Sequence, residues 1–279
     1  KREIQQKDKG DDMNEIKTMG DMITQMEKQV EKTLTERREK QKWENTFIKK
    51  QIDRRNRGEK ITIQDHIRAM VYSMLSSGAS WKRVLDYTDL RTGEITVVDE
   101  IFCQYEPEEL LEVDLEKLKE SISEKGLASQ YTSNQIDVLK DNIKTLQTIE
   151  EENGAIDNYY SQVIEEDSTK KKLVSELSSP GKQYKMKQLG FALTCEYLRN
   201  VGYDIPKPDR HIRRILGKDY LALSEKQPAR EKETFDIVMK LANVSGKSVA
   251  ETDYILWTYC ANGYGEICTT KKDKCSEYV

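Results

Sequence analysis

Helical periodicity runs along almost all of this 279-residue chain and constrains its fold more than any other feature. In residues 61–75, for example, apolar side chains recur every three or four positions, the spacing of one buried helix face. The same pattern predicts further helices over residues 107–123, 133–152, 168–177, 186–201, 229–243 and 248–261. Only residues 86–99, with Thr92-Gly93 as a turn, could form a β-hairpin. We therefore expect an all-α fold.

Residues 1–60 are predicted to form a charged helical extension. Five apolar side chains follow a narrow seam on its first helix: Ile16, Met19, Ile23, Met26 and Val30. The seam covers about two to three heptads, which is marginal for an isolated coiled coil. It could pack on the rest of the chain, or it could mediate self-association. Residues 37–60 are basic, with ten Lys or Arg against four Asp or Glu.

The charge balance limits the partners of this chain. Its net charge of −4 argues against a protein that coats nucleic acid over its whole surface. Charge is unevenly distributed, because residues 145–167 hold seven acids and no Lys or Arg. No apolar run approaches the ~20 residues of a membrane helix, so we expect no membrane partner. The five cysteines are sparse and odd in number, which indicates a reducing, intracellular setting such as the cytoplasm or nucleoid.

The segment 202–214 carries the strongest sign of chemistry. Pro206 and Pro208 stiffen the approach to Asp209, which stands at the expected start of an arginine-rich helix. A single acid among cations indicates a carboxylate held ionised beside a polyanion, as a DNA-processing active site requires. An Asp in this position is also a good helix N-cap, and the two interpretations are compatible.

Four segments follow one another in a specific order: Ala69–Ser80, residues 107–154, the stretch from Leu189-Gly190 to Gly202, and Asp209 with His211 in an Asp-x-His motif. In this order and spacing, residues 61–278 resemble the helix-hairpin-helix DNA glycosylases, the superfamily of endonuclease III and the adenine glycosylases. The resemblance covers about three-quarters of the chain.

The resemblance implies a two-lobed, all-α fold and an activity. One lobe would combine about residues 61–100 with 218–279, and the other would span about residues 101–217. The implied reaction is hydrolysis of the N-glycosidic bond of a damaged or modified base, as in base-excision DNA repair. Asp209 would be the catalytic residue, because an ionised carboxylate stabilises the cationic sugar and can orient or deprotonate the water.

The expected base pocket lies at the end of the early buried helix, at Tyr72, Ser77, Gly78 and Trp81. The family often has a Gln where Gly78 stands, and the smaller residue leaves room for a bulky or modified base. Such a base would stack on Trp81 or Tyr72. Alternatively, Trp81 is simply part of the core.

Duplex DNA is the partner that the resemblance implies. The hairpin turn near Gly190 has one glycine where the family usually has two, so its backbone grip on phosphate is weakened or differently shaped. Nearby lysines could substitute side-chain charge for it. The expected DNA-binding residues are Lys182, Lys185, Lys187, Gly190, Lys207, Arg210, His211, Arg213 and Arg214.

Two departures from the family pattern shape the expected chemistry. Phe191 or Ala192 stands where bifunctional members carry the sugar-attacking Lys, so we expect a monofunctional glycosylase, although Lys185 and Lys187 are close by in sequence. Cys268 and Cys275 reproduce one spacing of the family's iron–sulfur loop. Tyr278 stands where the next ligand belongs, so we expect no cluster, no other metal and no cofactor.

Other functions remain open at this point. The scaffold could have lost catalysis and serve as a DNA-binding module, as the single-glycine hairpin and the missing Lys suggest. The chain could instead act through protein contacts, using the N-terminal seam and the acidic residues 145–167. A third alternative is a glycosylase specialised for hypermodified bases of foreign DNA, for which Gly78 is the sequence hint.

Overall fold

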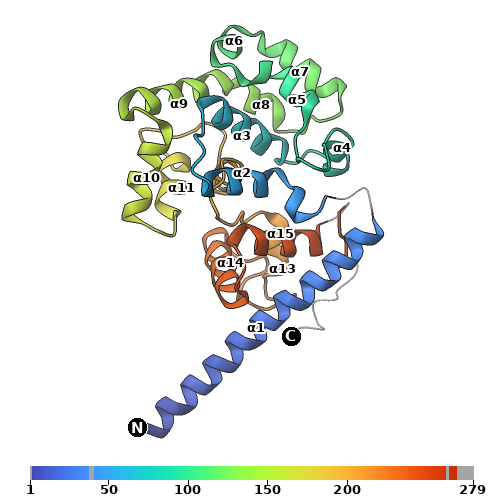
Figure 1. Cartoon of the computed structure of the whole chain (residues 1–279), viewed down its shortest axis with the longest axis vertical. Coiled ribbons are helices and arrows are strands. Elements are labelled where there is room, and N and C mark those ends of the chain that lie inside the picture. The colour runs from blue at the N-terminus through green and yellow to red at the C-terminus, as the bar shows by residue number, and fades with distance from the viewer. Residues whose placement is uncertain (1, 38–40, 262–263, 269–279) are drawn as a thin grey trace. The chain divides into compact units, whose positions relative to one another are not determined.

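The computed structural model describes residues 2–37, 41–261 and 264–268, with side chains from residue 18 onward. Every regular element in these ranges is a helix, as Figure 1 shows, so the all-α prediction is confirmed. The expected β-hairpin at residues 86–99 is wrong. Asp89 N donates to Glu94 O and Gly93 N to Asp89 O, each at 2.8 Å. These bonds close a short loop rather than extend a strand pair.

The chain forms two compact units, which we call the terminal unit (residues 1–43 and 206–279) and the middle unit (residues 44–205). This division differs from the expected lobes, because residues 61–100 belong to the middle unit. The physical reason is packing: the buried helix of residues 63–75 lies against the helix of residues 191–200. Among the described residues, no helix combines the length and the apolar character needed to span a membrane.

The described part of the terminal unit contains one long helix and three helices from the second half of the chain. These are α1 (Arg2–Glu36), α13 (Arg210–Ile215), α14 (Glu231–Ser245) and α15 (Val249–Cys260). The division between the two units falls within the 3₁₀ turn η1 (Trp43–Asn45).

Helix α1 packs on α14 and α15, and its apolar seam is used for this contact. Ile23 and Met26 are fully buried, and Val30 is 2% exposed. Gly20 permits the close approach, because a Cβ there would lie 2.8 Å from the carbonyl oxygen of Val244 in α14. The described part of the seam is thus covered within the chain, as the first of the two alternatives expects. Self-association stays a prediction.

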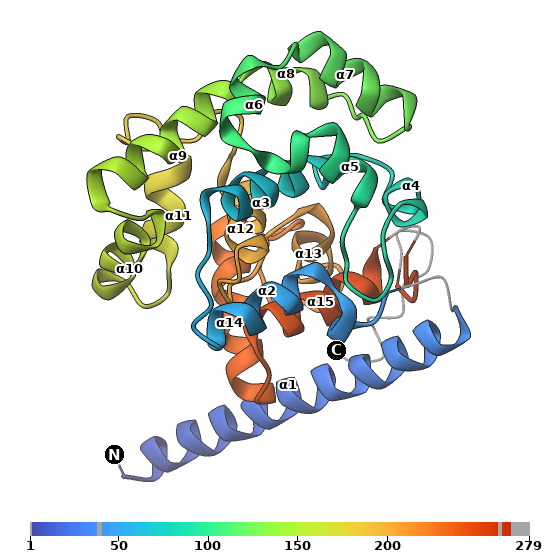
Figure 2. The same cartoon turned by 45° about the horizontal axis from the view of Figure 1, so that its top comes forward.

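The middle unit holds the remaining helices, which Figure 2 shows from a second direction. They are α2 (Phe47–Asn56), α3 (Ile63–Leu75), α4 (Trp81–Asp86), α5 (Thr96–Ile101), η2 (Cys103–Tyr105), α6 (Pro107–Glu112), α7 (Leu115–Glu124), α8 (Thr132–Asp137), α9 (Leu139–Asn153), α10 (Ile156–Glu166), α11 (Lys171–Ser178) and α12 (Phe191–Asn200).

Helix α3 is the central element of the middle unit. It begins with a capping box, in which the Thr62 hydroxyl accepts from Asp65 N and the Asp65 carboxylate accepts from Thr62 N. Nine of its thirteen residues are buried, and it packs on α12. Gly202, just after α12, has a φ of +90°, and a Cβ there would lie 2.4 Å from Gln51 O in α2. A larger residue at this position would separate α2 from the end of α12.

A buried polar cluster ties α2, α3, α10 and α12 together. Arg55 donates two hydrogen bonds of 3.1 Å to the Asp157 carboxylate, and the Tyr203 hydroxyl donates a third. The fully buried His66 has Nε2 3.7 Å from Asp157 and Nδ1 2.6 Å from the Tyr197 hydroxyl. Burial raises the pKa of Asp157, but the nearby imidazole and guanidinium outweigh burial and lower it to about 2.

Asp157→Asn tests this cluster. Because the folded-state pKa is depressed from 3.8 to about 2, the charge stabilises the fold above about pH 4, and this contribution is lost as pH falls toward 2. A shift of this size corresponds to roughly 2 kcal/mol of unfolding free energy. Urea unfolding near neutral pH should show that loss, and the difference from wild type should shrink in acid.

Asp86→Asn is the control for this prediction. Asp86 is exposed, 3.8 Å from Arg83, so its removal should change stability by less than about 0.5 kcal/mol. A destabilisation of Asp157→Asn that stays constant down to about pH 2 would show that its carboxylate charge is not the cause.

Candidate functional site

The segment that leads to Asp209 is fixed by a buried acid in α15. Residues 206–208 are buried, and Lys207 N donates a 2.8 Å hydrogen bond to Asp253 Oδ2. Asp253 is itself only 2% exposed. Asp209 N in turn donates to Lys207 O at 2.8 Å. Both hydrogen bonds involve the backbone of Lys207, which lies between Pro206 and Pro208, and they hold the start of α13 in one position. Lys207, which was expected to contact DNA, is buried and interacts with other residues of the chain.

Asp209 is the N-cap of α13, as one of the two compatible interpretations predicts. Its Oδ1 atom accepts from His211 N at 2.7 Å and from Ile212 N at 3.0 Å. Within the described ranges, no hydrogen bond or ion pair reaches Oδ2. One carboxylate oxygen is therefore oriented by the backbone, while the other keeps its lone pairs for a ligand or a water.

His211 is a half-buried neighbour of this carboxylate. Burial lowers the pKa of its imidazole, the Asp209 charge acts in the opposite direction, and the charges of Arg210 and Arg214 lower it further. The imidazole is therefore neutral near pH 7. A neutral imidazole can donate or accept one hydrogen bond beside Asp209 without adding a charge.

The arginines of α13 have different surroundings. Arg213 Nε donates to Ala229 O at 2.8 Å, and Arg214 Nη2 donates to Cys260 O at 2.7 Å. Both guanidinium groups thus satisfy carbonyl oxygens of the terminal unit itself. Arg210 is exposed. The sequence predicts that all three contact DNA, and Arg210 is the one best placed to do so.

Tyr72, an expected pocket residue, belongs to a buried polar network. Its hydroxyl donates to Asp99 Oδ1 at 2.8 Å and accepts from Ile95 N at 2.7 Å. Arg68 Nη2 donates to the same carboxylate at 2.7 Å. The Tyr72 ring packs on Phe47, with centroids 4.8 Å apart, and the side chain is 6% exposed. These contacts give Tyr72 a place in the core rather than a free ring face.

The other expected pocket residues lie together at the end of α3. Gly78 has a φ of +87°, and a Cβ there would lie 3.4 Å from the ring of Tyr131. The Ser129 hydroxyl donates to Ser77 O at 2.7 Å and so joins the two loops. Trp81 begins α4 and is half-buried. Sequence reasoning missed Tyr131, which is 48% exposed, because nothing in its loop distinguishes an exposed ring from a packed one.

The three lysines between α11 and α12 have unlike partners. Lys182 Nζ pairs with Glu176 at 2.9 Å, and Lys187 Nζ pairs with Asp141 at 2.7 Å. Both lysines are exposed. Lys185 turns inward and donates to backbone carbonyls. The lysine run is thus not one uniform basic surface.

Gly190, the turn glycine, is the N-cap of α12 and has open space around it. No side chain caps this helix start. The backbone at Gly190 can therefore be approached closely from outside. Phe191 and Ala192 follow it, so no amino group stands at the first two helix positions.

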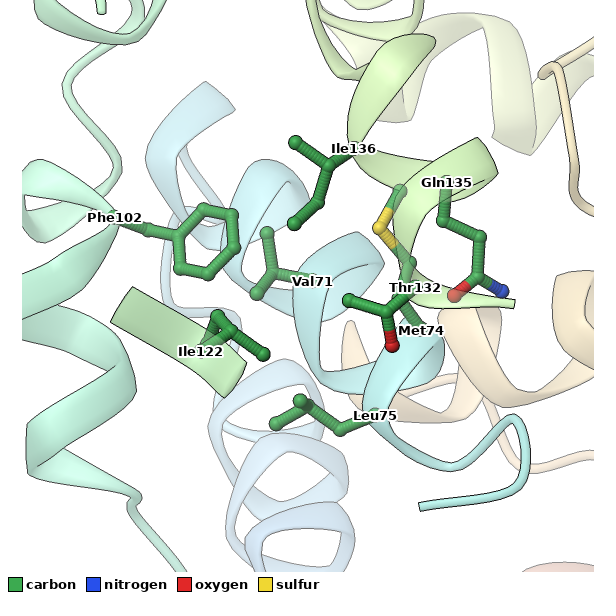
Figure 3. Close-up of a pocket in the computed structure, with 8 residues that line it drawn as sticks. All are labelled: Val71, Met74, Leu75, Phe102, Ile122, Thr132, Gln135 and Ile136. Atoms are coloured by element: carbon green, nitrogen blue, oxygen red, sulfur yellow. The ribbon is translucent and has the colours of Figure 1, made fainter. Parts of the chain in front are cut away.

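A small apolar cavity lies beside α3 in the middle unit (Figure 3). It is lined by Val71, Met74, Leu75, Phe102, Ile122, Thr132, Gln135 and Ile136. Its volume of about 10 Å³ admits at most one water and no nucleobase. Gln135 Oε1 is buried there and has no hydrogen-bond partner among the described residues. The cavity suits a structural water and is not a substrate pocket.

No described group of three or more His, Cys, Asp or Glu side chains could hold a metal ion. Cys260 and Cys268 are fully buried, and burial raises the pKa of the Cys260 thiol. The Cys260 thiol donates to His211 O at 3.6 Å. Cys275 and Tyr278 lie outside the described residues, so the expectation for the iron–sulfur loop stays a prediction.

Comparisons with known proteins give a fold but no family. No protein-family model matches the chain, and no curated protein matches it. A crystal structure of Methanocaldococcus jannaschii 8-oxoguanine glycosylase/lyase, in complex with a 15mer DNA containing 8-oxoguanine, is similar with a TM-score of 0.50. The identity is 15%, and the match covers 83% of this chain and 94% of that one. The likeness is one of fold.

Asp253→Ala tests how the start of α13 is held. The change removes the acceptor of Lys207 N, which is buried, so it should cost about 1–3 kcal/mol of unfolding free energy. The Lys207 amide should also exchange its hydrogen faster, as measured by NMR or mass spectrometry. Asp253→Asn keeps an acceptor oxygen and should retain most of the protection. If the exchange rate of the Lys207 amide is unchanged in Asp253→Ala, Asp253 does not hold the start of α13.

Proposed function

We propose that this chain is a monofunctional DNA glycosylase. It takes a damaged or modified base out of duplex DNA and hydrolyses the N-glycosidic bond with a water activated by Asp209. The observation that carries the proposal is the Asp209 carboxylate, whose Oδ1 is fixed by two backbone N–H groups while Oδ2 accepts no bond within the described ranges. The carboxylate is thereby oriented before any substrate arrives.

The chemistry follows from this arrangement. The bond from C1′ to the base nitrogen breaks, and its electron pair leaves with the base, which takes up a proton. Positive charge develops on the sugar, where the Asp209 carboxylate stabilises it. A water oxygen then bonds to C1′, and the water proton passes to Oδ2. Because Oδ1 is already held, little reorganisation of the carboxylate is needed during the reaction.

The fold supports the proposal by analogy. The similar structure is that of an enzyme named as an 8-oxoguanine glycosylase/lyase and bound to DNA. A shared fold does not by itself transfer an activity. Support for the activity therefore comes from Asp209 itself, which follows a glycine turn along the chain and caps a helix with an exposed arginine.

Several features support binding of DNA. The open turn at Gly190 offers backbone N–H groups to a phosphate, and Arg210, Lys182 and Lys187 are exposed cations. The exposed ring of Tyr131 offers a surface on which a base can stack, and stacking offsets part of the cost of flipping a nucleotide. Binding should weaken steeply as salt rises.

The rival proposal is a DNA-binding module without catalysis. It is favoured by one observation: the two cap bonds give Asp209 a complete structural role in α13. Specialisation for hypermodified bases of foreign DNA has weaker support, since the space expected at Gly78 lies against the Tyr131 ring. Kinetics of Asp209 variants separate catalysis from capping.

Asp209→Asn should abolish most base release. The amide keeps an oxygen that can cap α13 but carries no charge, so single-turnover release should fall by at least about 10²–10³-fold on a duplex that wild type processes. DNA affinity and melting temperature should change little. Asp219→Asn, an exposed acid just beyond α13, is the control. Asp209→Asn activity within a few-fold of wild type would refute the catalytic role.

Borohydride trapping tests the water mechanism. With Phe191 and Ala192 at the start of α12, no amine is expected to attack C1′, so sodium borohydride should trap no protein–DNA adduct while free base is released. The released product should be an abasic strand that breaks on treatment with alkali. A trapped adduct that disappears in Lys185→Met or Lys187→Met would instead assign a lyase step to that lysine.

A further inference from the structure

Lys185 differs from its two neighbours in the loop between α11 and α12. Its Nζ atom donates to Met186 O at 2.5 Å and to Leu189 O at 3.3 Å. No acid pairs with it among the described residues, whereas Lys182 and Lys187 each have one. The side chain is half-buried, and burial lowers the pKa of its amino group. The Lys185 amino group thus contacts the backbone of the turn rather than an acidic side chain.

Other backbone groups of this turn are also hydrogen-bonded within the protein. The fully buried Asn142 donates to Lys187 O at 3.0 Å and accepts from Lys187 N at 2.7 Å. Met186 N donates to Leu177 O at 2.9 Å. Gln188 has a φ of +57° and reverses the chain. The carbonyls of Met186, Lys187 and Leu189 therefore all have donors from the protein.

The consequence concerns the backbone N–H groups of the same turn. With the carbonyl oxygens held inside, the N–H groups of Gln188, Leu189 and Gly190 have no hydrogen-bond partner within the described part of the chain. Two carbonyl oxygens close to one another repel, and a cation between them offsets this repulsion; the Lys185 ammonium does so for Met186 O and Leu189 O.

We propose that Lys185 is the internal cation of the hairpin, a positioning residue whose ammonium group holds the turn in the conformation that presents its backbone N–H groups to a DNA phosphate. This inference rests on the proposed DNA binding. It gives Lys185 a role unlike the surface contact that its sequence predicts. It also means that the turn needs no bound metal ion to offset its carbonyl oxygens.

The role predicts a dependence on the identity of the salt cation. In Lys185→Met the carbonyl oxygens lose their ammonium, and an alkali cation can take its place because carbonyl oxygens are good ligands for Na⁺ and K⁺. Tetramethylammonium is too large to do so. Wild type carries its own cation and should be indifferent to this choice at a fixed ionic strength.

The test is fluorescence anisotropy with a labelled duplex in KCl, NaCl or tetramethylammonium chloride of equal ionic strength. Wild type should bind equally well in all three. Lys185→Met should bind about tenfold more weakly in tetramethylammonium chloride and recover part of that loss in KCl or NaCl. Lys182→Met and Lys187→Met are matched controls. Their smaller losses should be the same in every salt, because their ammonium groups pair with carboxylates, Glu176 and Asp141, and not with carbonyl oxygens of the turn.

The outcomes separate this inference from the proposed function. If wild type binds no duplex, the proposed function fails and the inference falls with it. If wild type binds but Lys185→Met matches it in all three salts, the inference alone is overturned. An equal loss in every salt, with a flatter salt dependence, would make Lys185 a direct phosphate contact and would also overturn it. Should Lys185→Met melt early, Lys185→Gln keeps a donor for the carbonyls without the charge and should show the same dependence on the cation.

Discussion

The chemistry proposed for this protein depends on two backbone N–H groups at the start of α13. They hold Oδ1 of Asp209, and the position of α13 is in turn held by Asp253 through Lys207 N. A carboxylate fixed in this way can cap a helix and serve a reaction at once, because the two tasks use different oxygens. The proposed mechanism needs no further side chain at the cap. It uses the lone pairs of Oδ2, which the cap hydrogen bonds leave unused.

Many of the basic side chains near the proposed site form contacts within the protein. Arg213, Arg214 and Lys185 donate to carbonyl oxygens of their own units, and Lys182 and Lys187 pair with acids. This distribution agrees with the net charge of −4. Because so many cations have partners within the chain, the proposed DNA binding depends on a few exposed cations and on backbone N–H groups at defined points. It does not depend on a broad basic surface.

Local signals in the sequence predicted the local features well. Periodicity identified α3 and α12, and the Pro-Asp step identified the N-cap at Asp209, because caps and amphipathic faces depend on neighbours within a few residues. Tertiary partners were not predictable in this way. Tyr72 was expected to stack on a base. In the structure its hydroxyl bonds Asp99 and its ring packs on Phe47, and both residues are more than twenty positions away in sequence.

The same limit explains the other differences. The seam of α1 is apolar, but nothing in it shows that α14 and α15 cover it rather than a second copy. The division into units followed the packing of α3 on α12, a contact between segments more than a hundred residues apart. Lys185 and Lys187 have the same side chain two residues apart, yet Lys185 donates to carbonyl oxygens of the turn and Lys187 pairs with Asp141, which is 46 residues away in sequence.

The most direct test of the central claim is to look for free base. Purified protein would be incubated with duplexes that carry uracil, alkylated, oxidised or hypermodified bases, and the released bases would be identified by mass spectrometry. If Asp209 catalyses base release, one class of base is set free and an equal amount of abasic sites appears in the DNA. Salt-sensitive binding to these duplexes, with no free base from any of them, would contradict it and leave a DNA-binding module on a glycosylase-like fold.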